Sequence, residues 1–272
     1  MTEAQTIEAA PAPRTRVSLA ADLSQLGVTR GMTLLVHSSL SSLGWVCGGP
    51  VAVIEALLDV LGPDGTLVMP AHSGDLSDPG YWENPPVPQD WWPVIRETMP
   101  AFDPARTPTR GMGRIAELFR TWPGAIRSNH PVDSFAALGK HAAVVTSNHS
   151  LEDSLGAGSP LQRVYDLDGY VLLLGVGFDS NTCFHLAEVR SGRYTHIHQG
   201  APVFVDGRRV WRAYRNVDYQ MDGFVECGAA LEAAGKVRTG PVGSSTSRLF
   251  PMRQGVDFAE RWLTEHRSPP AA

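Results

Sequence analysis

The sequence predicts an α/β protein, a three-layer α/β/α fold built around a mostly parallel central sheet. Short continuous apolar runs alternate with segments of helical periodicity along the first seventy residues. The strongest apolar run, 170–176, is likewise followed by a helical segment. Buried strands that alternate with helices form parallel sheets whose faces the helices cover. Ligands of such sheets bind beyond the carboxyl ends of the strands, where this chain places polar residues.

The first half of the chain supplies a βαβ unit and a long loop. Apolar spacing, a proline at a helix start and glycine turns define the elements. The expected helices are 15–28, 50–61 and 113–122, and the expected strands are 33–36, 66–69 and 134–139. The loop 72–110 is proline-rich, with one short helix at 91–98, yet it is too aromatic for a disordered linker. A long ordered loop in a compact domain is usually functional.

The second half adds a strand, a hairpin and several helices. Tyr170–Val176 is a buried strand, and Asp206-Gly207 joins two alternating segments, 195–205 and 208–213, through a primed turn. The helices are 160–166, 182–192, 222–234 and 257–266. We therefore expect one large domain over residues 15–267, with the long loop as an insertion and the hairpin and helices near the C-terminus. Residues 1–14 are expected to be a flexible leader.

Composition excludes several classes of protein. The 272 residues contain 43% hydrophobic and 19% charged residues, with a net charge of -5, so the chain is neither disordered nor suited to nucleic acid. No apolar run is long enough to span a membrane, and no signal-peptide core is present. We expect a cytoplasmic protein without nucleic-acid or membrane partners, acting as a monomer or homodimer.

Metal and disulfide chemistry have weak support. Cys47, Cys183 and Cys227 are far apart and form no CxxC pair. His196 and His198 share a face of a strand, but without clustered carboxylates a structural role is favoured over a metal site. We predict no metal.

The best candidate for chemistry is the segment that follows the 170–176 strand. Asp179 stands at the strand end, and His185 and Glu188 lie on one face of the next helix. A carboxylate beside an imidazole fixes its tautomer and favours the protonated form, as a general base requires. We expect Asp179 to supply that carboxylate. The alternative is a helix cap at Asp179 and a packed core histidine at His185.

Other patterns are less specific. His37-Ser38-Ser39 follows the first strand, but the chain lacks the GxSxG elbow of α/β-hydrolases. The run that begins at Gly175 lacks the third glycine of a dinucleotide fingerprint, and a Walker motif is absent.

The acidic residues cluster in the long loop. Residues 72–105 contain six acids and one base, Arg96, so their charge equals that of the whole chain. Carboxylates mixed with tryptophan and tyrosine suit a polycationic small molecule, because acids pair with ammonium groups and rings cover apolar faces. The alternative is a solvated acidic loop.

Several segments in order make the chain similar to a known family. The segments are 34–44 (LLVHSSLSSLG), 61–70 (LGPDGTLVMP), 107–113 (TPTRGMG), 127–131 (RSNHP), 172–182 with 185–188 (LLLGVGFDSNT, HLAE) and 240–243 (GPVG). The chain resembles the aminoglycoside 3-N-acetyltransferases over residues 15–265. The resemblance implies acetyl transfer from acetyl-CoA to the 3-amine of the 2-deoxystreptamine ring of an antibiotic.

The resemblance also implies a set of site residues. Catalysis falls to His185, Asp179 and Glu188. Acetyl-CoA would contact His37, Ser38, Ser39, Leu43, Gly44, Trp45, Val46, Thr109, Met112 and Gly113. The antibiotic would contact Asp75, Tyr81, Glu83, Trp91, Glu188 and Asp218. The glycines 48–49 at a helix start would also suit CoA. His72 is left unassigned.

Three alternatives to direct transfer stay open. Acetylation of another amine, such as a biosynthetic intermediate, fits the same chemistry. A ping-pong route would use Cys183 as acyl carrier, activated by His185. A protein that only sequesters cationic antibiotics would need no acyl donor.

Overall fold

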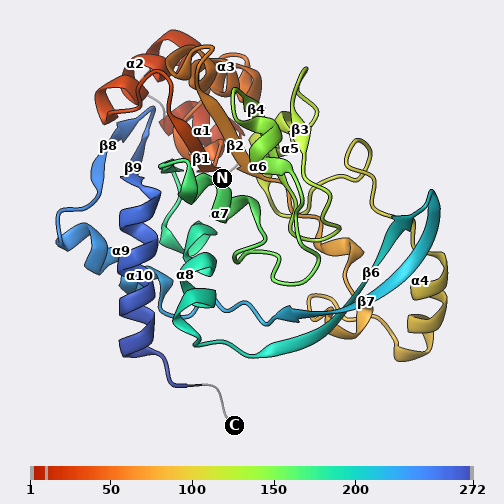
Figure 1. The fold of residues 1–272 in the computed structure, drawn as a ribbon. Coiled ribbons are helices and arrows are strands. Elements are labelled where there is room, and N and C mark those ends of the chain that lie inside the picture. Colours follow the sequence, from red (N-terminus) through yellow and green to blue (C-terminus); the bar gives the residue numbers. More distant parts are fainter. Residues whose placement is uncertain (1–2, 10–11, 270–272) are drawn as a thin grey trace.

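A seven-stranded sheet forms the centre of the molecule (Figure 1). The computed structural model describes residues 3–9 and 12–269. The strand order in the sheet is β3-β4-β2-β1-β5-β9-β8. Its strands are β1 Thr33–Ser38, β2 Thr66–Pro70, β3 Ile126–Arg127, β4 Phe135–Gly139, β5 Tyr170–Leu174, β8 Arg238–Val242 and β9 Ser245–Pro251. The predicted α/β fold is confirmed.

The sheet is parallel only in its middle. β1 pairs in parallel with β2 and β5, whereas β3, β4, β8 and β9 all pair antiparallel to their neighbours. The prediction of a mostly parallel sheet is therefore wrong at both edges. The connections β3–β4 and β8–β9 are short, and a short turn can join only antiparallel strands, because a parallel pair needs a crossover.

Helices cover both faces of the sheet. They are α2 Arg16–Leu26, α3 Gly49–Leu61, α5 Gly113–Phe119, α6 Ala142–Thr146, α7 Pro160–Asp166, α8 Cys183–Ser191, α9 Phe224–Ala233 and α10 Met252–His266. Alternate residues of a strand point to opposite faces, so Leu34 and Val36 pack with α2, α3 and α5, whereas Leu35 packs with the later helices. Two separate cores result, one on each side of the sheet.

Local sequence sets the ends of the helices. Thr15 caps α2 through a reciprocal capping box with Ser18, and Gly27 ends that helix in a left-handed conformation. Ser159 caps α7, and Gly192 ends α8 in the same way as Gly27. These boundaries agree with the expected helices to within a few residues.

The N-terminal leader is not without structure. Helix α1 spans Glu3–Ala9. Arg14 donates its backbone N–H to the carbonyl of Trp45, and its own carbonyl accepts from Cys47, which ties residue 14 to the loop after β1. The flexible leader was predicted from composition, and composition carries no information about backbone hydrogen bonds to a distant loop.

The long loop and the hairpin form a projection beside the sheet. The hairpin strands are β6 His196–Val205 and β7 Arg208–Val217, and in Figure 1 they extend to α4 Trp92–Thr98. Asp206 and Gly207 both have positive φ, as the predicted primed turn requires. Arg209 donates to the carbonyl of Met99 at 3.0 Å, which attaches α4 to the hairpin. The remaining loop is a series of 3-10 turns, η2 Gly74–Leu76, η3 Pro79–Tyr81 and η4 Gln89–Trp91.

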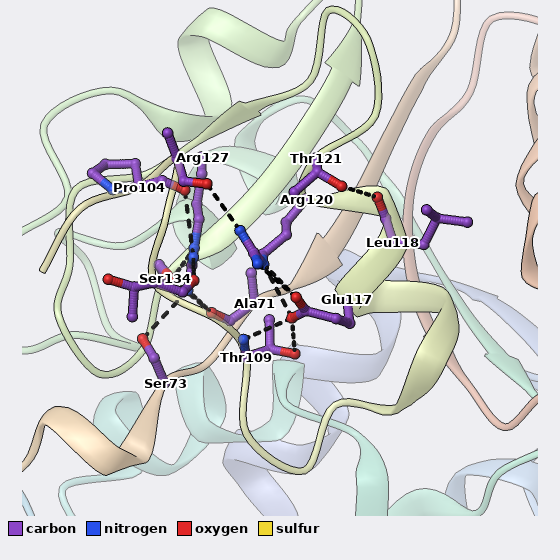
Figure 2. A network of polar contacts seen from close by, with 12 residues as sticks. Ala71, Ser73, Pro104, Thr109, Glu117, Leu118, Arg120, Thr121, Arg127 and Ser134 are labelled. Carbon is purple, nitrogen blue, oxygen red and sulfur yellow. Dashed lines mark hydrogen bonds and ion pairs between the residues drawn. The ribbon is translucent and has the colours of Figure 1, made fainter.

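A buried arginine anchors the end of this loop (Figure 2). Arg127 of β3 donates to the carbonyls of Ala71, Pro104 and Thr107 and to the hydroxyl of Ser134. No carboxylate lies among these partners, and burial lowers the pKa of the guanidinium to about 10. The arginine thus joins the end of β2 to the far part of the loop, which leads directly to Gly111 and Met112 of the site.

No helix among the described residues is long and apolar enough to cross a membrane.

Candidate active site

Two adjoining cavities lie beyond the carboxyl ends of the parallel strands. The first, here the histidine cavity, has a volume of about 350 Å³ and is lined by His37, His72 and His185 together with Asp133 and Asp179. The second, here the serine cavity, has a volume of about 570 Å³ and is lined by Ser38, Ser39 and the 44–46 loop. The residues shared by both linings are Ser38, Gly111, Met112, Val176 and Ser180. A ligand in one cavity can therefore reach a ligand in the other.

His185 is held by one turn of α8. Its Nδ1 lies 2.7 Å from Oε2 of Glu188, three residues further along the helix. Tyr219 and Phe224 pack against the ring, with centroid separations of 5.1 and 4.9 Å. If Nδ1 donates its proton to Glu188, Nε2 is left with a free lone pair, and His185 lines the cavity. This is the arrangement of an oriented general base.

Glu188 is fully buried and is itself held on its second oxygen. Oε1 accepts a 2.6 Å bond from Nη1 of Arg267 and a 3.1 Å bond from the backbone N–H of Gln220. The carboxylate therefore connects α8 to the segment after β7 and to the end of α10. A buried carboxylate needs such partners, since an unpaired charge in the interior is costly.

The predicted role of Asp179 is not the observed one. Asp179 lies in the short turn η5 Phe178–Ser180, is exposed, and lines the histidine cavity. Among the described residues it makes no hydrogen bond to His185, whose partner is Glu188. The physical reason is that α8 begins at Cys183, so a residue four positions earlier is off the helix, whereas positions i and i+3 share a helical face.

Two further histidines share the cavity. His37 is the penultimate residue of β1, and His72 follows β2. Burial, aided by the proximity of the other cavity histidines, lowers the pKa of His37 to about 3. Burial likewise lowers the pKa of His72 to about 4, against the opposing charge of Asp133. Both rings are neutral at physiological pH.

Sequence reasoning left His72 unassigned and missed Asp133 and Tyr219 altogether. His72 had a signal, because it follows a predicted strand at the edge where ligands bind. Asp133 precedes an antiparallel strand and bonds the hydroxyl of Ser154 at 2.6 Å, a contact that no local pattern encodes.

Most residues expected to contact acetyl-CoA line the serine cavity. They are Ser38, Ser39, Gly44, Trp45, Val46, Met112 and Gly113, accompanied by Arg114 and by Gly49 at the start of α3. His37 lines the histidine cavity instead. Leu43 is fully buried in the core. Thr109 donates both its N–H and its hydroxyl to Glu117, each at 2.7 Å (Figure 2).

The acidic residues of the long loop line neither cavity. Asp75 is ion-paired with Arg110, and Asp78 is ion-paired with Arg96 at 2.8 Å. Tyr81 and Trp91 are exposed, 46% and 54% respectively. Of the residues expected to contact the antibiotic, Asp75, Tyr81, Glu83, Trp91 and Asp218 line neither cavity, and Glu188 is committed to His185 and Arg267. The cavity carboxylates are Asp133 and Asp179.

The cysteines and the strand histidines take no part in the site. All three cysteines are free thiols, of which Cys183 and Cys227 are buried. His196 bonds Arg215 on the neighbouring strand of the hairpin. Within residues 3–9 and 12–269, no group of three or more histidines, cysteines or carboxylates is arranged to hold a metal ion.

The buried histidines predict strong sensitivity to acid. Burial lowers the pKa of His37, His72, His130 and His149 from an ordinary value of 6.5. Below about pH 6.5 the unfolded chain binds protons that the folded chain does not, so the free energy of unfolding decreases as the pH is lowered. The loss approaches about 1.4 kcal/mol per pH unit for each histidine. Denaturant unfolding between pH 7.5 and 5 measures this dependence. In His72→Gln the unfolding free energy should change less steeply with pH, by the contribution of one histidine. A stability that is constant over this range would contradict it.

Comparison with known proteins agrees with the resemblance seen in the sequence. The family model for aminoglycoside 3-N-acetyltransferase matches residues 35–264. One relative is the SPbeta prophage-derived aminoglycoside N(3')-acetyltransferase-like protein YokD of Bacillus subtilis. It is 52% identical over 96% of this chain and 97% of its own length. The crystal structure of YokD superposes with a TM-score of 0.95, covering 97% of this chain and 98% of that one at 51% identity.

Two other similar structures contain a ligand. AAC-IIIb, binary with CoASH, has a TM-score of 0.84 at 32% identity and covers 96% of this chain and 100% of its own. AAC-VIa, bound to sisomicin, has a TM-score of 0.85 at 30% identity and covers 94% and 100%. The family match spans most of the sheet and most of the residues that line the two cavities. The chain therefore belongs to the aminoglycoside 3-N-acetyltransferase family of acyltransferases.

Proposed function

We propose that the protein transfers the acetyl group of acetyl-CoA to the 3-amino group of the 2-deoxystreptamine ring of an aminoglycoside, and so confers resistance to the antibiotic. The observation that carries the proposal is the His185–Glu188 pair, whose His185 lines the histidine cavity next to the adjoining serine cavity. One cavity suits an amine beside a base, and the other suits an acyl carrier. The similar structures that hold CoASH and sisomicin support the two ligand classes.

The serine cavity offers suitable groups for CoA. Gly49, the first residue of α3, lines the cavity, and helix N-termini favour anions such as the pyrophosphate of CoA. Arg114 adds a positive charge to the same lining. The thioester would then lie at the boundary with the histidine cavity.

Chemistry at the boundary follows from the orientation of His185. The neutral amine attacks the thioester carbon while Nε2 of His185 takes its proton, directly or through one water. The tetrahedral intermediate then expels the thiolate, the carbon–sulfur bond breaks, and the imidazolium returns the proton to sulfur. Glu188 stabilises the imidazolium, and Arg267 holds Glu188 in place.

The route through an acyl-cysteine has little structural support. Cys183 is fully buried and does not line either cavity. Burial also raises the pKa of its thiol well above the ordinary range, which suppresses the thiolate that would act as nucleophile. Direct transfer in a ternary complex needs no such intermediate.

A second candidate is acetylation of a different amine. The observation that favours it is the position of the acidic loop, whose Asp75 and Asp78 are ion-paired outside the cavities. Two carboxylates, Asp133 and Asp179, remain beside His185. A smaller amine with one further cationic group would match them as well as a full antibiotic.

A thiol-release assay with acetyl-CoA tests the proposal. The amines to compare are 2-deoxystreptamine antibiotics, 2-deoxystreptamine alone, and small diamines without the ring. We expect release with the antibiotics, and NMR of the product should show acetylation at the 3-amine. Release with the small diamines alone would replace the first candidate by the second. Calorimetric binding of antibiotic without any thiol release would indicate a sequestering protein and overturn both.

A further inference from the structure

Two of the three histidines in the histidine cavity each have one ring nitrogen without a hydrogen-bond partner among the described residues. Nε2 of His37 and Nε2 of His72 are buried, and no described group lies within hydrogen-bond distance of either. Buried polar atoms are nearly always satisfied, and each exception in a native structure calls for an explanation. An external ligand that enters the cavity is the simplest partner for such an atom.

Histidines elsewhere in the same core show the contrast. His130 accepts the N–H of Asp133 on Nδ1 and bonds the carbonyl of Leu151 through Nε2. His149 bonds the Ser128 hydroxyl through Nδ1 and the carbonyl of Ser154 through Nε2. His130 is fully buried and His149 partly so, yet both nitrogens of each ring are satisfied. Burial of a histidine in this core therefore does not by itself leave a ring nitrogen without a partner.

His37 lies at the boundary between the two cavities. The next residue, Ser38, lines both of them, whereas His37 lines only the histidine cavity. His37 is 5% exposed and is close enough to His185 for a charge on His185 to lower the pKa of His37. A thioester carried in the serine cavity must pass residue 38 to meet an amine activated by His185. Its carbonyl group then comes beside the His37 ring.

His72 follows β2 and lines the histidine cavity but not the serine cavity. The negative charge of Asp133, which lines the same cavity, acts on the His72 ring. A carboxylate beside His72 suits a cationic amine, so we assign the amine side to His72 and the acyl side to His37.

We propose that the side chain of His37 donates a hydrogen bond to the carbonyl oxygen of the acetyl thioester and to the oxyanion that forms from it. This assignment rests on the proposed acetyl transfer and adds a catalytic residue to it. A neutral imidazole keeps its own proton, so His185 alone moves a proton during the reaction. Its N–H stabilises negative charge where that charge develops, and burial strengthens the effect because water is excluded. Burial keeps the ring neutral, since it lowers the pKa of His37 to about 3.

Two substitutions at this position separate hydrogen bonding from packing. His37→Gln retains an N–H donor, and His37→Leu fills similar space without one. In the thiol-release assay we expect His37→Leu to lower kcat about 100- to 1,000-fold, with KM for acetyl-CoA changed less than about threefold. His37→Gln should stay within about tenfold of the wild type. The proposal is wrong if His37→Leu keeps more than about a tenth of the activity, or if His37→Gln falls as far as His37→Leu.

A second measurement does not depend on turnover. The wild-type protein is labelled with ¹⁵N-histidine and titrated with CoA, with acetyl-CoA, and with a ketone analogue in which CH₂ replaces the thioester sulfur. The signal missing from the His37→Leu spectrum identifies the ring. We expect the His37 N–H resonance to move downfield with acetyl-CoA and the ketone but not with CoA. An unmoved resonance overturns the assignment, and so does a failure of the protein to bind acetyl-CoA.

The two measurements also distinguish this assignment from the proposed function. A downfield shift with acetyl-CoA, together with no thiol release for any amine, would contradict the proposed function while leaving the contact of His37 with the acyl group established. Thiol release without a shift would support acetyl transfer and contradict the role of His37.

Discussion

Replacement of His185 by alanine is expected to lower turnover at least a hundredfold while CoA still binds. The ring nitrogen that faces the cavity is the base in the proposed reaction, and general-base catalysis contributes roughly 10²- to 10⁴-fold. The serine cavity does not include His185 in its lining, so the affinity for CoA should change little. Thiol-release kinetics and calorimetry with CoA measure the two quantities.

The matched control is His198→Ala, since His198 is exposed on the hairpin and lines neither cavity. It should leave both turnover and CoA binding unchanged. Near-normal turnover in His185→Ala would refute the assignment of the base. Loss of CoA binding in that variant would show instead that His185 supports the fold of the second cavity.

Removal of the Glu188 carboxylate is expected to affect both stability and turnover. Glu188→Gln leaves the guanidinium of Arg267, 14% exposed, without its charged partner, and loss of one partner of a buried ion pair costs about 3–5 kcal/mol. It also weakens the hold on Nδ1 of His185, so that the tautomer with a free Nε2 is no longer favoured. Thermal unfolding and kcat measure the two effects separately.

A double variant separates the structural role from the catalytic one. Glu188→Gln combined with Arg267→Met removes both charges, so much of the lost stability should return, because no unpaired buried charge remains. Turnover should stay low, because His185 still lacks its carboxylate. Glu265→Gln, an exposed residue of α10, serves as the control and should leave both quantities unchanged. Recovery of full turnover in the double variant would show that Glu188 acts only through stability.

The elements of the sheet centre were predictable because they depend on local patterns. Apolar runs marked β1, β2 and β5, and the proline at the start of α3 and the glycine after α8 marked helix ends. The edge strands β3 and β8, and β9 beside β8, were not predicted. β3 has two residues, and β8 contains Gly240 and Pro241, which are poor strand formers. These strands form because neighbouring strands supply their hydrogen bonds, and β9 joins the sheet through β5, which is distant in sequence.

The candidate site likewise has features that local sequence predicts and features that depend on tertiary contacts. Sequence periodicity indicated that His185 and Glu188 share a helical face and that polar groups follow the central strands, and the family resemblance implied that 44–46 and 112–113 belong with Ser38. Only the tertiary structure decided that Glu188, and not Asp179, holds the imidazole, because Arg267 comes to Glu188 from the far end of the chain. It also placed His37 and His72 in one cavity, and it paired Asp75 and Asp78 of the acidic loop with arginines outside that cavity. The physical reason is range: helical and strand periodicity act over a few residues, whereas burial, pairing of charges and the pKa of a side chain depend on groups that only the folded chain brings together.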